Sequence, residues 1–125
     1  FEFERFVGSL LEKMDYEVLV TTPTADGGID VVAEKEDPLL AGKVLVQCKR
    51  WSNPVGVRVV RELYGVAIGE AAIKSVIITT SSFTNEAITF ARGKPIELID
   101  GKKLRDIVTR YLRADEQPGI ENVTY

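Results

Sequence analysis

The chain has 125 residues, of which 45% are hydrophobic and 28% charged, and its formal net charge at pH 7 is −3. This length and balance are typical of one globular domain with its own core, and they exclude a disordered chain. The single cysteine excludes an internal disulfide, and the absence of histidine argues against a zinc site or a histidine-based nucleophilic triad.

The sequence shows no membrane or export signal. No apolar run reaches the roughly 20 residues that a membrane span needs, and the start does not resemble a signal peptide. Since a lone cysteine also suits reducing conditions, we expect a cytoplasmic protein that does not contact a membrane.

Charge is unevenly distributed along the chain. Residues 1–42 hold 3 basic and 10 acidic side chains, whereas residues 43–113 hold 13 basic and 6 acidic ones. This distribution fits an acidic, metal-binding end beside a basic surface that faces phosphates. The alternative is ordinary solvated charge on helices.

The first segment has the spacing of an amphipathic helix that continues to about Asp15. Its apolar stripe consists of Phe3, Phe6, Val7, Leu10, Leu11 and Met14. On a helical wheel Glu4 borders this stripe, which makes it the acid of the segment best placed to reach inward. Alternatively, Glu4 only favours the positive end of the helix dipole.

Alternation of polar and apolar residues predicts three consecutive strands: residues 16–22, a stretch around Asp30, and a strand that ends at Lys49. The turn-rich connection over residues 35–42 is short enough to make the last two strands antiparallel neighbours. Asp30, Gln47 and Lys49 are polar side chains on otherwise apolar strands, so we expect them to converge.

These converging groups are suited to phosphodiester hydrolysis. Asp30, together with an oxygen of Gln47 and the backbone carbonyl of Cys48, offers the hard oxygen ligands that Mg²⁺ takes. Lys49 can stabilise the charge of the pentavalent phosphorane or orient the attacking water. The alternative is a plain salt bridge between Asp30 and Lys49. The side chain of Cys48 is expected in the core as a small hydrophobe.

The rest of the chain alternates between helical and extended patterns. We expect a helix over 55–72, a strand over 76–79, a helix from 85 to 92–93, a strand over 96–99 and a helix over 102–113. The 55–72 helix is apolar over more than half of its circumference. One sheet cannot cover so wide an arc, so a second subunit or a missing domain is expected on its other side.

Several side chains of this half are candidate DNA contacts, namely Arg50, Arg58, Arg61, Ser82 and Thr84. A solvated polar strip explains the helical arginines equally well, and the hydroxyls can serve only as helix caps. Trp51 is expected to cover the core, with stacking on DNA as the alternative.

Five segments occur in a fixed order between residue 3 and about residue 104. They are Phe3-Glu4, Asp26-Gly27-Gly28-Ile29-Asp30, Val46-Gln47-Cys48-Lys49-Arg50, Thr79-Thr80-Ser81-Ser82-Phe83-Thr84 with Ala87, and Ile96-Glu97-Leu98-Ile99-Asp100-Gly101. This ordered set resembles the Mrr-type catalytic domain of the restriction-endonuclease-like, PD-(D/E)xK, nuclease superfamily. Asp15 departs from the glycine usual at the end of the first helix, but aspartate tolerates the left-handed conformation.

The resemblance implies an α/β fold, a restriction-endonuclease-like core with a central mixed β-sheet flanked by α-helices. It implies a Mg²⁺-dependent DNA endonuclease, with Mn²⁺ as a substitute, in restriction or defence against foreign or modified DNA. Glu4, Asp30, Gln47 and Lys49 would form its active site, with Glu4 joining the metal directly or holding its water. The alternative is a nuclease-fold module that binds DNA or a protein partner without cutting; the presence of all four residues favours the enzyme.

We expect residues 1–113 to form the Mrr-like catalytic domain and residues 114–125 to be a tail or a linker to a possible further domain. Cutting both strands of a duplex requires two active centres, so we also expect a two-fold homodimer. Val59, Leu63 and Val66, on the wide apolar helix, are predicted at or near its contact. The alternative is that a further domain covers this helix.

Overall fold

The computed structural model describes residues 2–20, 31–35 and 41–112 of the chain. Asp30 and the segment 114–125, which carry expectations stated above, lie outside these residues.

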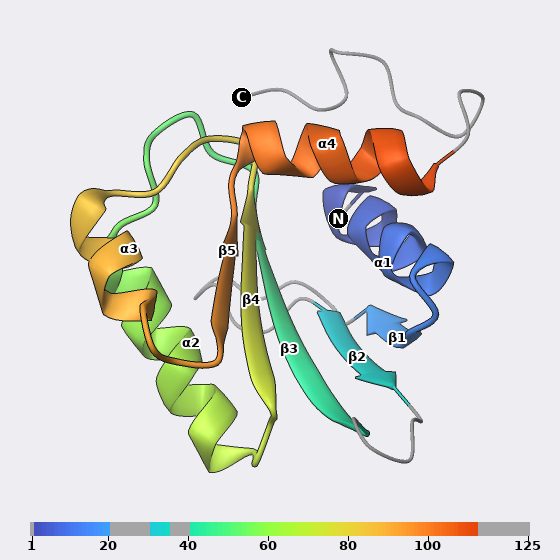
Figure 1. Cartoon of the computed structure of the whole chain (residues 1–125), viewed down its shortest axis with the longest axis horizontal. Helices are drawn as coiled ribbons and strands as arrows, with labels where there is room; N and C mark the ends of the chain where they lie inside the picture. Colours follow the sequence, from blue (N-terminus) through green and yellow to red (C-terminus); the bar gives the residue numbers. More distant parts are fainter. Residues whose placement is uncertain (1, 21–30, 36–40, 113–125) are drawn as a thin grey trace.

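The described residues form five strands and four helices (Figure 1). In chain order they are α1 (Glu2–Lys13), β1 (Glu17–Val20), β2 (Val31–Lys35), β3 (Gly42–Lys49), α2 (Val57–Gly69), β4 (Lys74–Thr79), α3 (Asn85–Ala91), β5 (Ile96–Ile99) and α4 (Gly101–Tyr111). The strands make one sheet in the order β1-β2-β3-β4-β5, antiparallel from β1 to β3 and parallel from β3 to β5. Helices α1 and α4 cover one face and α2 and α3 the other (Figure 1), so the expected mixed sheet between helices is confirmed. No helix of the described part is long and apolar enough to cross a bilayer.

Helix α1 buries the apolar stripe that the sequence predicts. Phe3, Val7 and Leu10 are buried and pack with residues of β2, β3 and α4 in one core cluster. After the helix ends at Lys13, Asp15 adopts a positive φ of 70°. Aspartate is one of the few residues that tolerate this conformation, which confirms the expectation for that position.

Strand β3 is buried along most of its length because β2 and β4 flank it. Its side chains alternate between the two core clusters: Val46 and Cys48 pack on the α1 and α4 side, and Leu45 packs on the α2 side. This confirms that the Cys48 side chain points into the core. Because side chains alternate along a strand, Gln47 lies on the same face of β3 as Leu45.

Helix α2 begins later than its sequence pattern predicts. Its first residue is Val57, which follows the N-cap Gly56. Val55 instead forms a parallel bridge with Phe83, and its N–H donates to the carbonyl of Ser82 at 2.8 Å. The helix cannot start at residue 55 because these long-range bonds hold Val55 in an extended conformation.

The apolar arc of α2 is only partly covered. Val60, Leu63 and Ala67 are buried against the sheet and α3. Val66 and Ile68 remain 43% and 63% exposed. The expectation that one sheet does not cover the whole arc is therefore confirmed within the described residues.

Helix α4 starts where a side chain caps it. Oδ1 of Asp100 accepts a hydrogen bond from the N–H of Lys103 at 2.8 Å, so Gly101 is the first helical residue rather than part of a turn. Leu104 is fully buried, whereas Tyr111 near the end of the same helix is 40% exposed.

Candidate functional site

Two of the predicted site residues lie together at the carboxyl end of β3. Gln47 is buried, with 5% of its surface exposed, and Lys49 is half-buried. The Nζ atom of Lys49 lies 5.0 Å from the centroid of the Trp51 ring, a cation–π arrangement. Trp51 is 39% exposed, so its ring is not part of the buried core.

Strand β2 reaches the same part of the sheet. Val31, the first residue of β2, pairs with Val46, the residue before Gln47. The predicted antiparallel pairing of these two strands is thus confirmed. Asp30 directly precedes Val31 in the sequence but lies outside the described residues, so its convergence with Gln47 and Lys49 stays a prediction.

Glu4 lies in the first turn of α1. Its side chain is half-buried, and one carboxylate oxygen, Oε1, is shielded from solvent. The expected position at the border of the buried stripe is therefore confirmed. Helix α1 contacts β2, β3 and α4.

Hydroxyl groups at the end of β4 and directly after it bind the end of β3 and the chain that follows. Oγ1 of Thr79 donates to the backbone carbonyl of Lys49 at 2.8 Å, and the N–H of Thr80 donates to the same carbonyl at 3.2 Å. Oγ1 of Thr80 donates to the carbonyl of Trp51 at 3.1 Å. Thr79 and Thr80 are 0% and 1% exposed, so these bonds are shielded from water.

Ser81 extends this set of bonds. Its Oγ donates to the carbonyl of Asn53 at 2.7 Å, and its own carbonyl accepts from the N–H of Gly101 at 2.9 Å. The segments that follow β3, β4 and β5 are therefore tied together at one end of the sheet. Sequence reasoning missed the role of Thr79 and Thr80; the available signal was a run of hydroxyl residues directly after a buried strand.

The comparisons with known proteins agree with this architecture. Residues 1–108 match the family described as restriction endonuclease, by its Mrr catalytic domain. The chain belongs to this restriction endonuclease family. A similar curated protein is the type IV methyl-directed restriction enzyme EcoKMrr of Escherichia coli (strain K12), which is 45% identical over 82 residues. The match covers 65% of this chain but only 27% of that protein, so the chain spans less than a third of its curated relative.

Solved structures show the same fold. The DNA modification-dependent restriction endonuclease AspBHI has a TM-score of 0.73 at 21% identity, covering 88% of this chain and 31% of that one. MspJI restriction endonuclease in complex with a 27-mer oligonucleotide has a TM-score of 0.63 at 20% identity, covering 90% and 28%. These likenesses confirm the expected restriction-endonuclease-like core.

Three arginines of this restriction endonuclease domain were predicted to contact DNA, and all three are exposed. Arg58 pairs with Glu62 on its own helix at 3.2 Å. The guanidinium of Arg61 lies 5.4 Å from the centroid of the Phe90 ring. Since the pair of Arg58 is solvent-exposed, it is weak and leaves the guanidinium able to exchange partners.

The two hydroxyl candidates differ in what they do. Ser82 is exposed, whereas Oγ1 of Thr84 accepts a hydrogen bond from the N–H of Ala87 at 3.2 Å and caps α3. Thr84 therefore serves as a helix cap, and its contact with DNA stays a prediction.

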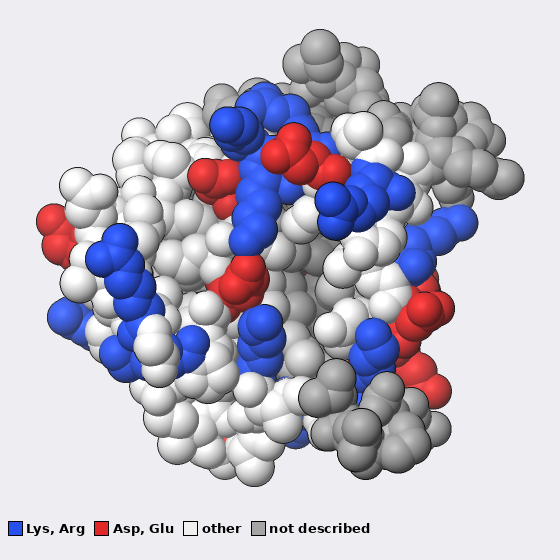
Figure 2. Space-filling model, in the orientation of Figure 1, with Lys and Arg blue, Asp and Glu red and all other residues white. Residues whose placement is uncertain are grey.

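Basic and acidic side chains are interspersed on the face shown in Figure 2. Lys and Arg gather near α4 and over the neighbouring strands, with Asp and Glu among them. The separation of charge along the sequence therefore does not produce a face of one sign on this side of the domain.

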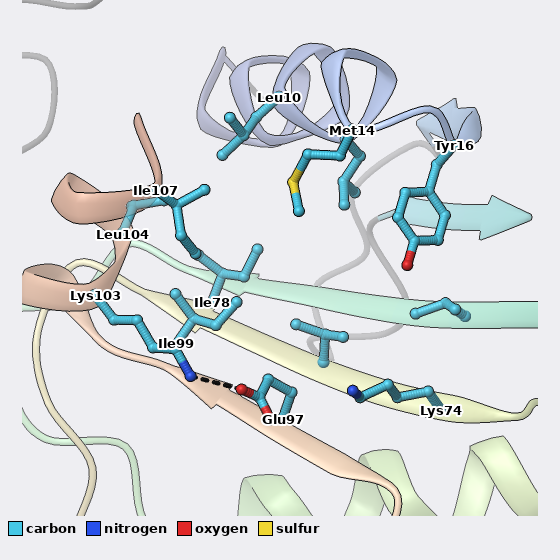
Figure 3. Close-up of a pocket in the computed structure, with 13 residues that line it drawn as sticks. Leu10, Met14, Tyr16, Lys74, Ile78, Glu97, Ile99, Lys103, Leu104 and Ile107 are labelled. Carbon is cyan, nitrogen blue, oxygen red and sulfur yellow. Dashed lines mark hydrogen bonds and ion pairs between the residues drawn. The ribbon is translucent and has the colours of Figure 1, made fainter. Parts of the chain in front are cut away.

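An apolar pocket of about 230 Å³ lies between α1, α4 and the sheet (Figure 3). Leu10, Met14 and Ile107 point into it, and the ion pair between Lys103 and Glu97 lies at its side. Its lining includes neither of the site residues on β3. The pocket therefore lies on the face of the sheet that α1 and α4 cover, apart from Gln47 and Lys49.

Proposed function

We propose that this domain hydrolyses phosphodiester bonds of DNA, as the catalytic part of a protein that restricts foreign or modified DNA. The observation that carries the proposal is the placement of Gln47 and Lys49 at the carboxyl end of β3, beside the start of β2, within a restriction endonuclease fold. Modified DNA is proposed as the substrate class because EcoKMrr is described as methyl-directed and AspBHI as modification-dependent.

The proposed cofactor is Mg²⁺, for which Mn²⁺ substitutes. Its ligands are proposed to be Asp30, the side chain of Gln47 and the backbone carbonyl of Cys48, with Glu4 bound directly or through water. These donors are all oxygens, which suit a hard cation, and Gln47 and Oε1 of Glu4 are both shielded from bulk water. Such a cation supplies charge stabilisation at the phosphate when bound.

Lys49 is proposed to act on the phosphate or on the attacking water, and Trp51 to hold Lys49 in place. The ammonium of Lys49 donates to a phosphate oxygen as negative charge develops there, or orients the attacking water. The ring of Trp51, 5.0 Å from Nζ, restricts where this ammonium lies. Of the DNA contacts proposed from sequence, Arg50, Arg58, Arg61 and Ser82 are exposed.

A cleavage assay tests the function. We expect the purified protein to nick or cut duplex DNA in Mg²⁺ or Mn²⁺ and to lose this activity in EDTA, because no protein group replaces the charge of the cation. Methylated and unmethylated versions of one plasmid serve as paired substrates. Restoration by added Mg²⁺ is the control for irreversible damage.

Undiminished cleavage in EDTA would contradict the metal requirement. Binding to DNA without any cleavage, in either metal and with either plasmid, would instead support the alternative of a nuclease-fold module that does not cut.

The domain is further proposed to act as a homodimer through the exposed side of α2. Leu63, one of the three residues predicted at this contact, is 3% exposed and packs in the chain's own core, so that assignment is wrong. Val59 and Val66 lie two turns apart on one side of the same helix, and Val66 is 43% exposed, so two such helices related by a two-fold axis can meet along that side.

We expect Val66→Lys to shift the sedimentation of the protein from dimer to monomer at micromolar concentration, because it buries unpaired charge at the contact. Ile88→Lys is the matched control, since Ile88 is 40% exposed on α3. A wild-type protein that sediments as a monomer would rule this interface out.

The remaining proposals concern the extent of the domain and the location of the protein in the cell. Residues 1–113 are proposed to form the catalytic domain, and the family match over residues 1–108 supports this extent. Residues 114–125 are proposed to be a tail or linker. A cytoplasmic location is proposed because the chain has a single cysteine, Cys48, which is buried and excludes an internal disulfide.

A further inference from the structure

Three consecutive hydroxyl residues, beginning with the last residue of β4, bind backbone carbonyls at alternate positions from the last residue of β3 onward. Thr79 binds the carbonyl of Lys49, Thr80 binds that of Trp51, and Ser81 binds that of Asn53. The distances are 2.8, 3.1 and 2.7 Å. We refer to Thr79, Thr80 and Ser81 as the hydroxyl ladder.

Two of these carbonyls are those of Lys49 and Trp51, the residues of the cation–π pair. The ladder thus holds the backbone of Lys49 and the backbone of Trp51 independently, and the Nζ atom and the ring lie 5.0 Å apart. Without regular secondary structure to hold it, the chain after Lys49 depends on bonds of this kind for a fixed path.

The ladder is itself anchored. Oγ1 of Thr79 also accepts from the N–H of Ser81 at 3.1 Å, and the two hydroxyl oxygens of these residues lie 3.1 Å apart. The carbonyl of Ser81 accepts a hydrogen bond from the N–H of Gly101 at the start of α4. Since Thr79 and Thr80 are almost fully buried, they do not reach a DNA backbone outside the protein.

We propose that Thr79 and Thr80 are positioning residues of the active site, which place the Lys49 ammonium by holding the carbonyls of Lys49 and Trp51. The expected effect on catalysis rests on the proposed nuclease function. The expected effect on the positions of Lys49 and Trp51 does not. A hydroxyl that fixes a reacting group affects turnover without touching the substrate, because small displacements of such a group are costly.

The test compares Thr79→Val and Thr80→Val, which keep the side-chain shape but remove the hydroxyl, with Thr79→Ser and Thr80→Ser, which keep it. Thr109→Val is the matched control, since Oγ1 of Thr109 donates to the carbonyl of Arg105 at 3.0 Å on the exposed side of α4. Thermal unfolding identifies any variant that fails to fold.

Two readouts are measured for each variant. In the cleavage assay we expect kcat to fall by about 10-fold to 100-fold in the valine variants, with little change in KM. We expect the serine variants to retain most of the wild-type kcat. Trp51 is the single tryptophan of the chain, so its fluorescence reports on this segment alone. We expect Thr80→Val to lower its anisotropy and raise its quenching by acrylamide, and Thr109→Val to change neither.

The outcomes separate this inference from the proposed function. If the wild-type protein cuts DNA and the folded valine variants cut equally well, the positioning role is overturned while the function stands. If the wild-type protein does not cut, the function fails, and an unchanged fluorescence of Trp51 in Thr80→Val then overturns the geometric part as well. A fall in kcat shared by Thr109→Val would also overturn the assignment, because the effect would not be specific to the ladder.

Discussion

Replacing Lys49 by alanine is expected to lower kcat for DNA cleavage by about 100-fold or more, the loss typical when a group that stabilises developing charge is removed. Lys49 is half-buried at the end of β3, where its ammonium lies beside the Trp51 ring. Single-turnover cleavage with saturating protein measures the effect on the chemical step without the contribution of product release.

Lys35→Ala is a closely matched control. Lys35 also ends a strand, is also half-buried, and its Nζ lies 5.0 Å from the centroid of the Tyr16 ring. Each substitution removes one cation–π contact, worth about 0.5–1 kcal/mol at such sites. We therefore expect similar small losses of stability from both variants, but a loss of cleavage only from Lys49→Ala. Near-normal turnover in Lys49→Ala would show that this lysine is structural.

The largest expected effect on stability is that of Leu45→Ala. Leu45 is fully buried on the central strand β3 and packs in the core with Val60 and Ile77. Truncation of such a leucine leaves a cavity and typically costs about 2–5 kcal/mol. A domain of this size has only about 5–15 kcal/mol of stability in total, so the variant loses a large part of it.

Leu19→Ala serves as the control because it makes the same chemical change on β1, where Leu19 is 64% exposed. Urea denaturation of both variants measures the free energy of unfolding. We expect Leu19→Ala to remain within about 0.5 kcal/mol of the wild type, as is usual for surface positions. Equal losses in the two variants would contradict the central position of Leu45.

Local patterns in the sequence determined the elements and the direction of many side chains. Period-two alternation on β3 predicted that Cys48 faces the core, and the helical spacing of α1 predicted that Glu4 borders its buried stripe. These predictions succeed because the period of a strand or helix and the burial of apolar groups are both set within a few residues. The ordered motifs likewise sufficed for the family and its fold.

Other features depended on which surfaces the fold brings together. A helical wheel shows that α2 is apolar over a wide arc, but only the packed sheet decides that Leu63 is buried and Ile68 is exposed. Similarly, the start of α2 depends on a bridge between Val55 and Phe83, which are far apart in the sequence.

The hydroxyl ladder could be seen only in the tertiary structure. A run of threonines and serines after a strand is compatible with capping, with phosphate contacts and with solvent exposure. The partners that distinguish these roles are the carbonyls of Lys49, Trp51 and Asn53, which lie 28 to 30 residues earlier in the chain. A hydrogen bond over such a separation is created by the parallel pairing of β3 with β4, and no local sequence pattern encodes it.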